Sequence, residues 1–272
     1  MSRHVKKTLL QRLRKNLKQV IPPPLRSKKP REFSPEELED LCEFTGLSPE
    51  SVKEYLRRKR GRRISNEFDW LRPNDAAEYA WFYRGSRTYL FAADEAWERA
   101  VETCEPGMKC LDFGGGGGRN ALGMAAKGGE VYYVDIGLIN SAFTAFRARK
   151  RGYALKVLDP MVQVDGAWCV DTAEAARLEG GFDLIVCDNV LEHVHDYHLV
   201  LQKLAAALKP KGRILECTPF KREKAYLFKK TEAEWDIHLK PKVGMQEAME
   251  ACGMRKLEGE GLWEKAATVP AS

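Results

Sequence analysis

The sequence predicts an α/β fold in which a mainly parallel sheet is flanked by helices. From about residue 108 onward, apolar runs of strand length alternate with segments of helical periodicity. This alternation requires crossover connections, which place helices on both faces of a parallel sheet. The chain has 272 residues, 44% of them hydrophobic, and therefore holds enough apolar material for one core and a small accessory region.

The predicted strands and helices follow one another in a regular order. The clearest runs of strand length are 109–113, 131–135, 182–187 and 213–217. Helical segments follow the first two strands, at 120–127 and 139–151. The end of the sheet is weakly marked: a sixth strand is expected within 257–263, and little chain is left for a seventh.

Residues 1–33 form a basic arm ahead of the predicted fold. The arm carries eleven lysine and arginine residues against one acid, Glu32, so the remainder of the chain is mildly acidic despite a net charge of +6. Apolar residues at helical spacing between positions 4 and 20 predict an amphipathic helix, which three prolines end. The arm is interpreted first as a solvated tail, second as a membrane-surface anchor through residues 1–21, and third as a nucleic-acid contact.

Residues 34–104 are predicted to be a helical accessory region. The Ser-Pro pairs at 34 and 48 each combine an N-cap with a first-turn proline. The segment 35–63 resembles a helix-turn-helix followed by basic residues that could contact phosphates. Glu50 opposes that interpretation, and any helical hairpin with a glycine turn looks similar. A structural or substrate-covering role is therefore preferred, and nucleic-acid recognition is the alternative function.

The most informative segment is a glycine-rich turn between a strand and a helix. It has the pattern acid-x-Gly-x-Gly-x-Gly, formed by Asp112, Gly114, Gly116 and Gly118. Glycines permit positive φ and let a ligand approach the backbone. Turns of this type hold nucleotides at the carboxyl edge of a parallel sheet. The nicotinamide and flavin pattern, with glycines at i, i+2 and i+5, is absent; the fifth residue after Gly114, for example, is Arg119.

A second acid lies at the tip of the next predicted strand. Asp135 ends the run 131–135 and stands 17 positions after Gly118. Near this spacing a carboxylate can accept hydrogen bonds from both ribose hydroxyls of a bound nucleoside. An acid that ends a strand is often only a turn residue, but beside the glycine turn Asp135 is predicted to bind ribose.

Taken in order, these segments resemble the class I S-adenosylmethionine-dependent methyltransferases, which have a Rossmann-like fold. The glycine turn resembles their motif I. Residues 182–194 (FDLIVCDNVLEHV) resemble their fourth strand and following turn, and residues 208–216 (LKPKGRILE) resemble their helix, turn and fifth strand. The resemblance covers about residues 108–256, and the catalytic domain is accordingly placed at 105–272.

The resemblance implies S-adenosyl-L-methionine as the cofactor and methyl transfer as the reaction. In this family the glycine turn backs onto the methionine part of the cofactor, and its acid supports the amino group. An acid after the third strand contacts adenine; Asp171 fits that spacing, and Asp159 is the alternative if 154–158 is the third strand and 160–170 an insertion. The cofactor-binding residues implied are Asp112, Gly114, Gly116, Gly118, Asp135, Asp171 and Asn189.

His193 is the implied catalytic base, because it follows the fourth strand, where a base for a hydroxyl acceptor commonly sits. His195, which also follows that strand, and His238 are the alternatives. Some relatives carry Glu-x-x-Glu-His here and bind a divalent metal. This chain has Asn189 at the first of those positions, so no metal is expected. The motifs of nucleobase methylases, Asn/Asp-Pro-Pro-aromatic and Pro-Cys, are absent. The expected acceptor is a small molecule, sugar or lipid-linked precursor methylated on oxygen.

The composition indicates whether membrane-spanning helices, metal sites or disulfides are expected. No run of about 18 apolar residues is present, so no transmembrane helix is expected. The seven cysteines form no Cys-x-x-Cys pair, which argues against a zinc site or a disulfide framework. We therefore expect reduced thiols in a cytoplasmic protein, with peripheral membrane contact through the basic arm as an alternative. Residues 219–242, rich in aromatic and basic side chains, are expected to cover the site.

Overall fold

The computed structural model describes residues 35–57, 95–191, 194, 196–217, 243–259 and 261–267. Contacts divide the chain into two compact units, Met1–Leu38 and Glu39–Ser272. The predicted basic arm and the predicted cover at 219–242 lie outside the described residues. All the strands among the described residues belong to the second unit. None of the described helices is long and apolar enough to cross a bilayer.

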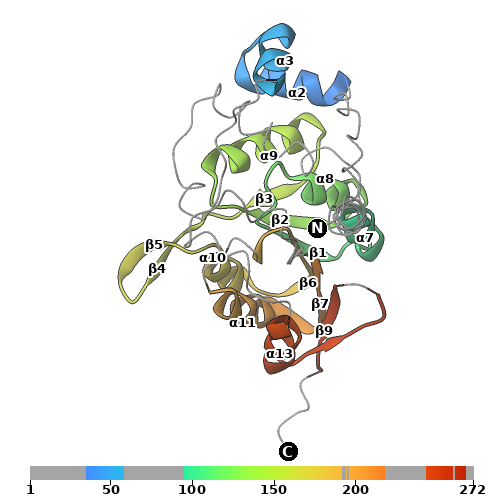
Figure 1. The fold of residues 1–272 in the computed structure, drawn as a ribbon, viewed down its shortest axis with the longest axis vertical. Helices are drawn as coiled ribbons and strands as arrows, with labels where there is room; N and C mark the ends of the chain where they lie inside the picture. The colour runs from blue at the N-terminus through green and yellow to red at the C-terminus, as the bar shows by residue number, and fades with distance from the viewer. Residues whose placement is uncertain are drawn as a thin grey trace, which may run out of the picture. The chain divides into compact units, whose positions relative to one another are not determined.

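A seven-stranded sheet forms the centre of the second unit (Figure 1). Its strands are β1 (Lys109–Phe113), β2 (Glu130–Val134), β3 (Leu155–Val157), β6 (Phe182–Asp188), β7 (Leu208–Cys217), β8 (Met254–Lys256) and β9 (Leu262–Lys265). Their spatial order is β3-β2-β1-β6-β7-β9-β8. The first five pair in parallel, and β9 runs antiparallel to both of its neighbours. The mainly parallel sheet predicted from the sequence is confirmed.

The strand order reverses between β1 and β6. From β1 the chain crosses to β2 and β3 on one side, and it later returns to β6 and β7 on the other. In open α/β sheets the connections diverge at such a point, and ligands bind outside the carboxyl ends of the strands. The predicted glycine turn directly follows β1, so it lies at this edge.

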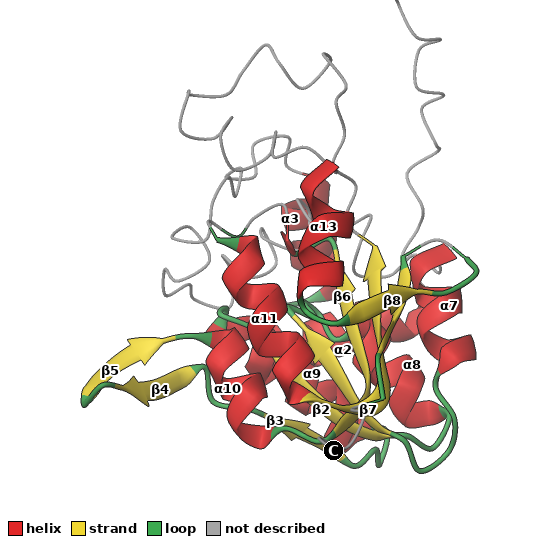
Figure 2. Cartoon of the chain, turned by 90° about the horizontal axis from the view of Figure 1, so that it is seen from below, coloured by secondary structure: helices red, strands yellow, loops and turns green. Residues whose placement is uncertain are grey.

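Helices cover both faces of the sheet (Figure 2). The helices that flank it are α7 (Glu95–Thr103), α8 (Arg119–Ala126), α9 (Leu138–Lys150), α10 (Thr172–Glu179), α11 (Tyr197–Ala207) and α13 (Val243–Ala251). Apolar residues of α10, α11 and α13 share one core cluster with the strands. Residues of α7 and α8 share a second cluster with the strands, and α9 contacts α8 and β3.

The central strands are apolar on both faces, which explains their continuous hydrophobic runs. Along β6, Ile185 and Cys187 belong to the core under α10 and α11, whereas Leu184 and Val186 belong to the core under α7 and α8. Side chains alternate between the faces of a strand, so a strand covered by helices on both sides needs an apolar residue at nearly every position.

A helical hairpin precedes the sheet, as the sequence predicts. α2 (Pro35–Thr45) ends before Gly46, whose φ of +68° suits a left-handed turn residue. α3 (Pro49–Arg57) begins after Ser48, whose Oγ accepts a hydrogen bond from the Ser51 backbone N–H at 3.2 Å. This bond is the predicted N-cap.

The structure corrects the prediction for the end of the sheet. The sixth strand is not 257–263 but β8, and a seventh strand, β9, is present. Gly259 and Gly261 have φ of +108° and +74°, and they reverse the chain between these strands. The Leu257 backbone N–H then donates to the Leu262 carbonyl at 2.9 Å. The predicted single run therefore contains the turn and the first two residues of β9.

A two-stranded hairpin is inserted after β3. β4 (Met161–Val164) pairs antiparallel with β5 (Ala167–Val170), and both views show this hairpin extending beyond the neighbouring helices (Figures 1 and 2). The third strand of the sheet is β3, at 155–157. Of the two alternatives raised by the sequence, the one with an insertion at 160–170 is therefore the one observed.

Candidate functional site

The glycine turn that follows β1 adopts a conformation that requires its glycines. Gly114, Gly116 and Gly118 have φ of +66°, +54° and +75°. A Cβ on Gly118 would lie 2.3 Å from the Thr144 side chain, and one on Gly114 would lie 2.6 Å from Val190. At Gly116 a Cβ would meet no heavy atom within 4 Å. The turn is thus packed closely at both ends, and its middle residue is free for a ligand to approach.

Asp112 lies beneath this turn and is almost fully buried. Its Oδ2 accepts a hydrogen bond from the Ala121 backbone N–H at 2.9 Å, which caps α8, because the N-cap residue Gly118 has no side chain. Its Oδ1 is buried and has no hydrogen-bond partner among the described residues. Burial raises the pKa of Asp112 to about 7, although the Ala121 bond opposes the shift. A buried acceptor without a partner fits a cationic amino group.

Asp135 follows β2 and ties the glycine turn to the next loop. Its Oδ2 accepts from the Gly116 N–H at 2.9 Å, and its Oδ1 accepts from the Gly137 N–H at 2.6 Å and from Asn140 Nδ2 at 3.0 Å. Burial raises the pKa of Asp135, and these three bonds oppose that effect. A carboxylate has about four lone-pair positions, so one position on Oδ2 stays available for a hydroxyl.

The carboxyl end of β6 adds an ion pair that the sequence analysis did not assign to the site. Arg119, the first residue of α8, donates from Nη2 to Asp188 Oδ2 at 2.8 Å, and both side chains are at most 10% exposed. Asn189 has a φ of +55° and donates from Nδ2 to Asp188 Oδ1 at 2.6 Å. The predicted cofactor residue Asn189 therefore turns its amide toward Asp188. An acid that ends the apolar run of β6 was the available signal for Asp188.

A family model described as a methyltransferase domain matches residues 83–253, well over half of the chain. The chain belongs to this methyltransferase-domain family. The match confirms the resemblance drawn from the glycine turn and the two later segments.

Two curated relatives illustrate the similarity of this methyltransferase to known proteins. The ubiquinone biosynthesis O-methyltransferase of Cronobacter sakazakii is 31% identical over 136 residues, which are 50% of this chain and 52% of that protein. The enzyme of the same name from Escherichia coli is 32% identical, covering 50% of this chain and 53% of its own. The chain thus spans about half the length of these relatives.

Solved structures of similar proteins include other methyltransferases. A SAM-dependent methyltransferase from Aquifex aeolicus has a TM-score of 0.45 and 16% identity, covering 66% of this chain and 90% of its own. Phosphoethanolamine N-methyltransferase 2 of Haemonchus contortus, in complex with S-adenosyl-L-methionine, has a TM-score of 0.44 and 20% identity, covering 64% of this chain and 42% of its own.

The structure corrects the reasoning that led to Asp171. That residue follows β5 of the inserted hairpin and not the third strand of the sheet. Its carboxylate caps α10 by accepting from the Glu174 N–H at 2.8 Å, and it also pairs with Lys203. Asp159 follows β3 by two residues and is exposed, with Oδ1 accepting from the Met161 N–H at 2.9 Å. The acid at the end of the third strand is therefore Asp159.

The predicted base, His193, lies outside the described residues, and so does Glu192. Its role as catalytic base stays a prediction. Among the residues that the structure describes, no three histidine, cysteine, aspartate or glutamate side chains are grouped so that they could hold a metal ion.

Proposed function

We propose that this methyltransferase transfers a methyl group from S-adenosyl-L-methionine to an oxygen atom of a small molecule, sugar or lipid-linked precursor. The observation that carries the proposal is the pair of buried carboxylates, Asp112 and Asp135, on either side of a glycine turn at the switch point of the sheet. The names of the curated relatives, O-methyltransferases of ubiquinone biosynthesis, support oxygen as the acceptor atom.

Each of these polar groups would bind a different part of the cofactor. Asp112 would hold the amino group of the methionine part through its unpartnered Oδ1, and the open face of Gly116 would accept the ligand against the backbone. Asp135 would bind the ribose through its remaining acceptor position. Asp159, at the end of β3, would contact adenine in place of Asp171.

The protein's contribution to the reaction is orientation and proton removal. When bound, S-adenosyl-L-methionine supplies a methyl group activated by its sulfonium. The site residues must hold the acceptor oxygen in line with the bond that breaks, and such positioning supplies much of the rate. A hydroxyl acceptor must also lose its proton, and His193 is the proposed base because it follows β6 closely in sequence.

Calorimetric titration with S-adenosylhomocysteine tests the site. The wild type should bind, and Asp135→Asn should bind at least tenfold more weakly, because it removes the negative charge and replaces one of the two acceptor oxygens by an N–H₂ donor. Asp165→Asn is the matched control, since Asp165 is exposed in the turn between β4 and β5 and should leave affinity unchanged. Absence of binding to the wild type would refute the proposal. Labelled cofactor with panels of hydroxyl and amine acceptors would then test the choice of oxygen.

A further inference from the structure

The glycine turn is held from one side by a face of α9. Thr144 Oγ1 donates to the Gly116 carbonyl at 3.2 Å, and Arg147, three residues later, donates from Nη1 to the Gly117 carbonyl at 2.9 Å. Residues three apart lie on the same face of a helix, so both bonds come from one surface. They fix the orientation of two successive peptide groups and leave the opposite side of Gly116 open.

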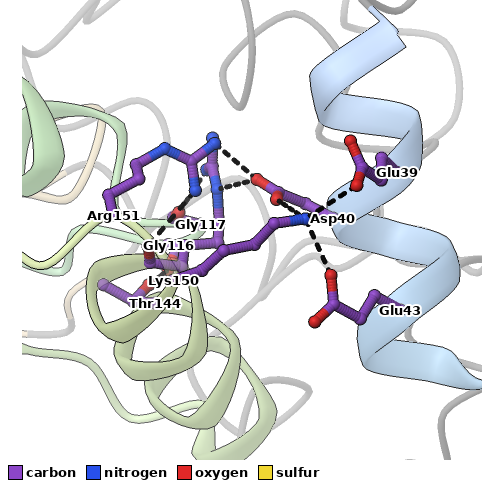
Figure 3. Close-up of polar contacts among 9 residues, drawn as sticks. Glu39, Asp40, Glu43, Gly116, Gly117, Thr144, Lys150 and Arg151 are labelled. Atoms are coloured by element: carbon purple, nitrogen blue, oxygen red, sulfur yellow. Dashed lines mark hydrogen bonds and ion pairs between the residues drawn. The ribbon is translucent and has the colours of Figure 1, made fainter.

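The same arginine is bound to α2, more than one hundred positions earlier in the sequence. Arg147 Nε donates to Asp40 Oδ2 at 3.2 Å, and the two side chains are 8% and 0% exposed. Figure 3 shows Asp40 facing Lys150 and Arg151, and Arg151 Nη2 also donates to Asp40 Oδ2 at 2.6 Å. A carboxylate this deeply buried is stable only while its cationic partners stay in place.

Apolar contacts reinforce this junction between α2 and α9. The Phe44 ring packs edge-on to the Phe143 ring at 5.0 Å and against Phe146 at 5.5 Å. At the exposed rim, Lys150 pairs with Glu43 at 2.7 Å and with Glu39 at 3.4 Å. Residues 39–45 of α2 are therefore fixed on α9 by the buried Asp40 carboxylate with its cationic partners, by two aromatic contacts and by ion pairs at the exposed rim.

We propose that Arg147 is a positioning residue for the cofactor, and that Asp40 sets its orientation, so that packing of α2 on α9 and cofactor binding strengthen each other. One guanidinium holds both the turn that would contact the cofactor and the helix that lies outside it. Without Asp40, the buried Arg147 would lose the carboxylate that orients its guanidinium toward the Gly117 carbonyl. By thermodynamic linkage, a cofactor that selects the ordered turn must also favour the packed helix. The inference rests on the proposed cofactor binding.

Titration with S-adenosylhomocysteine provides the first test. Arg147→Met should weaken binding about tenfold, because it removes a charged donor from the turn. Arg147→Lys should restore only part of the affinity, since a lysine cannot reach both acceptors with one planar fork. Arg149→Met is the control, because Arg149 is exposed on the same helix and should bind like the wild type. Equal affinity of wild type and Arg147→Met would overturn the inference while leaving the proposed function intact.

A double-mutant cycle separates coupling from general damage. Asp40→Asn should weaken binding in the wild type but have little further effect in the Arg147→Met background. Additive losses would show that Asp40 does not act through Arg147 and would refute the coupling.

Hydrogen exchange can be measured on the unmutated protein, so this test does not depend on whether a variant folds. Saturating S-adenosylhomocysteine should slow amide exchange in residues 39–45 at least threefold, alongside residues 114–118. Protection of the glycine turn without protection of α2 would overturn the linkage. A wild type that shows no affinity for the nucleoside would refute the proposed function as well as the inference.

Discussion

We expect Asp112 to destabilise the folded protein when no cofactor is bound, because its buried carboxylate lacks a partner that the cofactor would supply. The carboxyl is buried with one unpartnered oxygen, and burial raises its pKa from 3.8 to about 7. Because the folded pKa exceeds the unfolded value, the contribution of Asp112 to the free energy of unfolding is most favourable below about pH 4 and is lost as the pH rises toward 7. At about 1.4 kcal/mol per pH unit, the loss approaches about 4 kcal/mol above pH 7.

Replacement of Asp112 by asparagine removes this cost. The side chain keeps its shape and can still accept from the Ala121 N–H, but its own buried N–H₂ group lacks an acceptor, which reduces the gain to about 2 kcal/mol at pH 8. A gain of that size raises the unfolding midpoint by about 4–8 °C. The same change removes the anionic partner of the cofactor's amino group, so the affinity for S-adenosylhomocysteine should fall at least tenfold.

Thermal unfolding of Asp112→Asn and wild type at pH 8 and pH 5, with cofactor absent, measures the effect. The difference in midpoint should be clear at pH 8 and smaller at pH 5, where almost all of the folded wild-type Asp112 is protonated. Asp165→Asn, an exposed substitution, should show neither effect. A variant less stable than the wild type at pH 8, or a difference that does not change with pH, would refute the reasoning.

Three further outcomes are expected. His193→Ala should lower turnover at least one-hundredfold while cofactor affinity stays within twofold, measured once an acceptor is found; unchanged turnover would remove His193 as the base. Gly118→Ala should lower the free energy of unfolding by about 2–4 kcal/mol in denaturant titrations, because the new Cβ would overlap Thr144 and the backbone would be strained. Gly166→Ala is the control: Gly166 has a φ of +81° but open space around it, so the loss should be about 1 kcal/mol. Equal losses would contradict the packing argument. Deletion of residues 1–21 should reduce sedimentation with anionic liposomes if the basic arm is an anchor, and equal pelleting would discard that role.

The sequence was sufficient for the parts of the fold that are encoded locally. Strand and helix periods, the glycine turn and the N-cap of α3 each depend on residues close together in the chain. Asp135 was also placed correctly at the tip of β2, because strand length and acid position are local facts. Its bond to the Gly116 N–H was not foreseen, since that bond depends on how the turn folds back over the strand.

The inserted hairpin was missed as an element although a signal for it was present. Asp165 and Gly166 have φ of +50° and +81°, as expected for the Asp-Gly pair that favours a tight two-residue turn. The spacing argument for Asp171 passed over that pair. Contacts such as Arg147 with Asp40 had no local signal at all, because the partners are 107 positions apart and meet only through packing.

The position of β9 constrains the order in which the sheet can be completed. β8 is synthesised before β9, yet within the described sheet it is joined to the other strands only through β9. While residues 262–265 are still inside the ribosome, β7 therefore presents a bare row of backbone donors and acceptors, and β8 has no strand to pair with. In the nascent chain the edge of β7 therefore stays exposed until nearly the last described residues have emerged. The glycine turn after β1 is synthesised much earlier than β9, the strand that covers this edge.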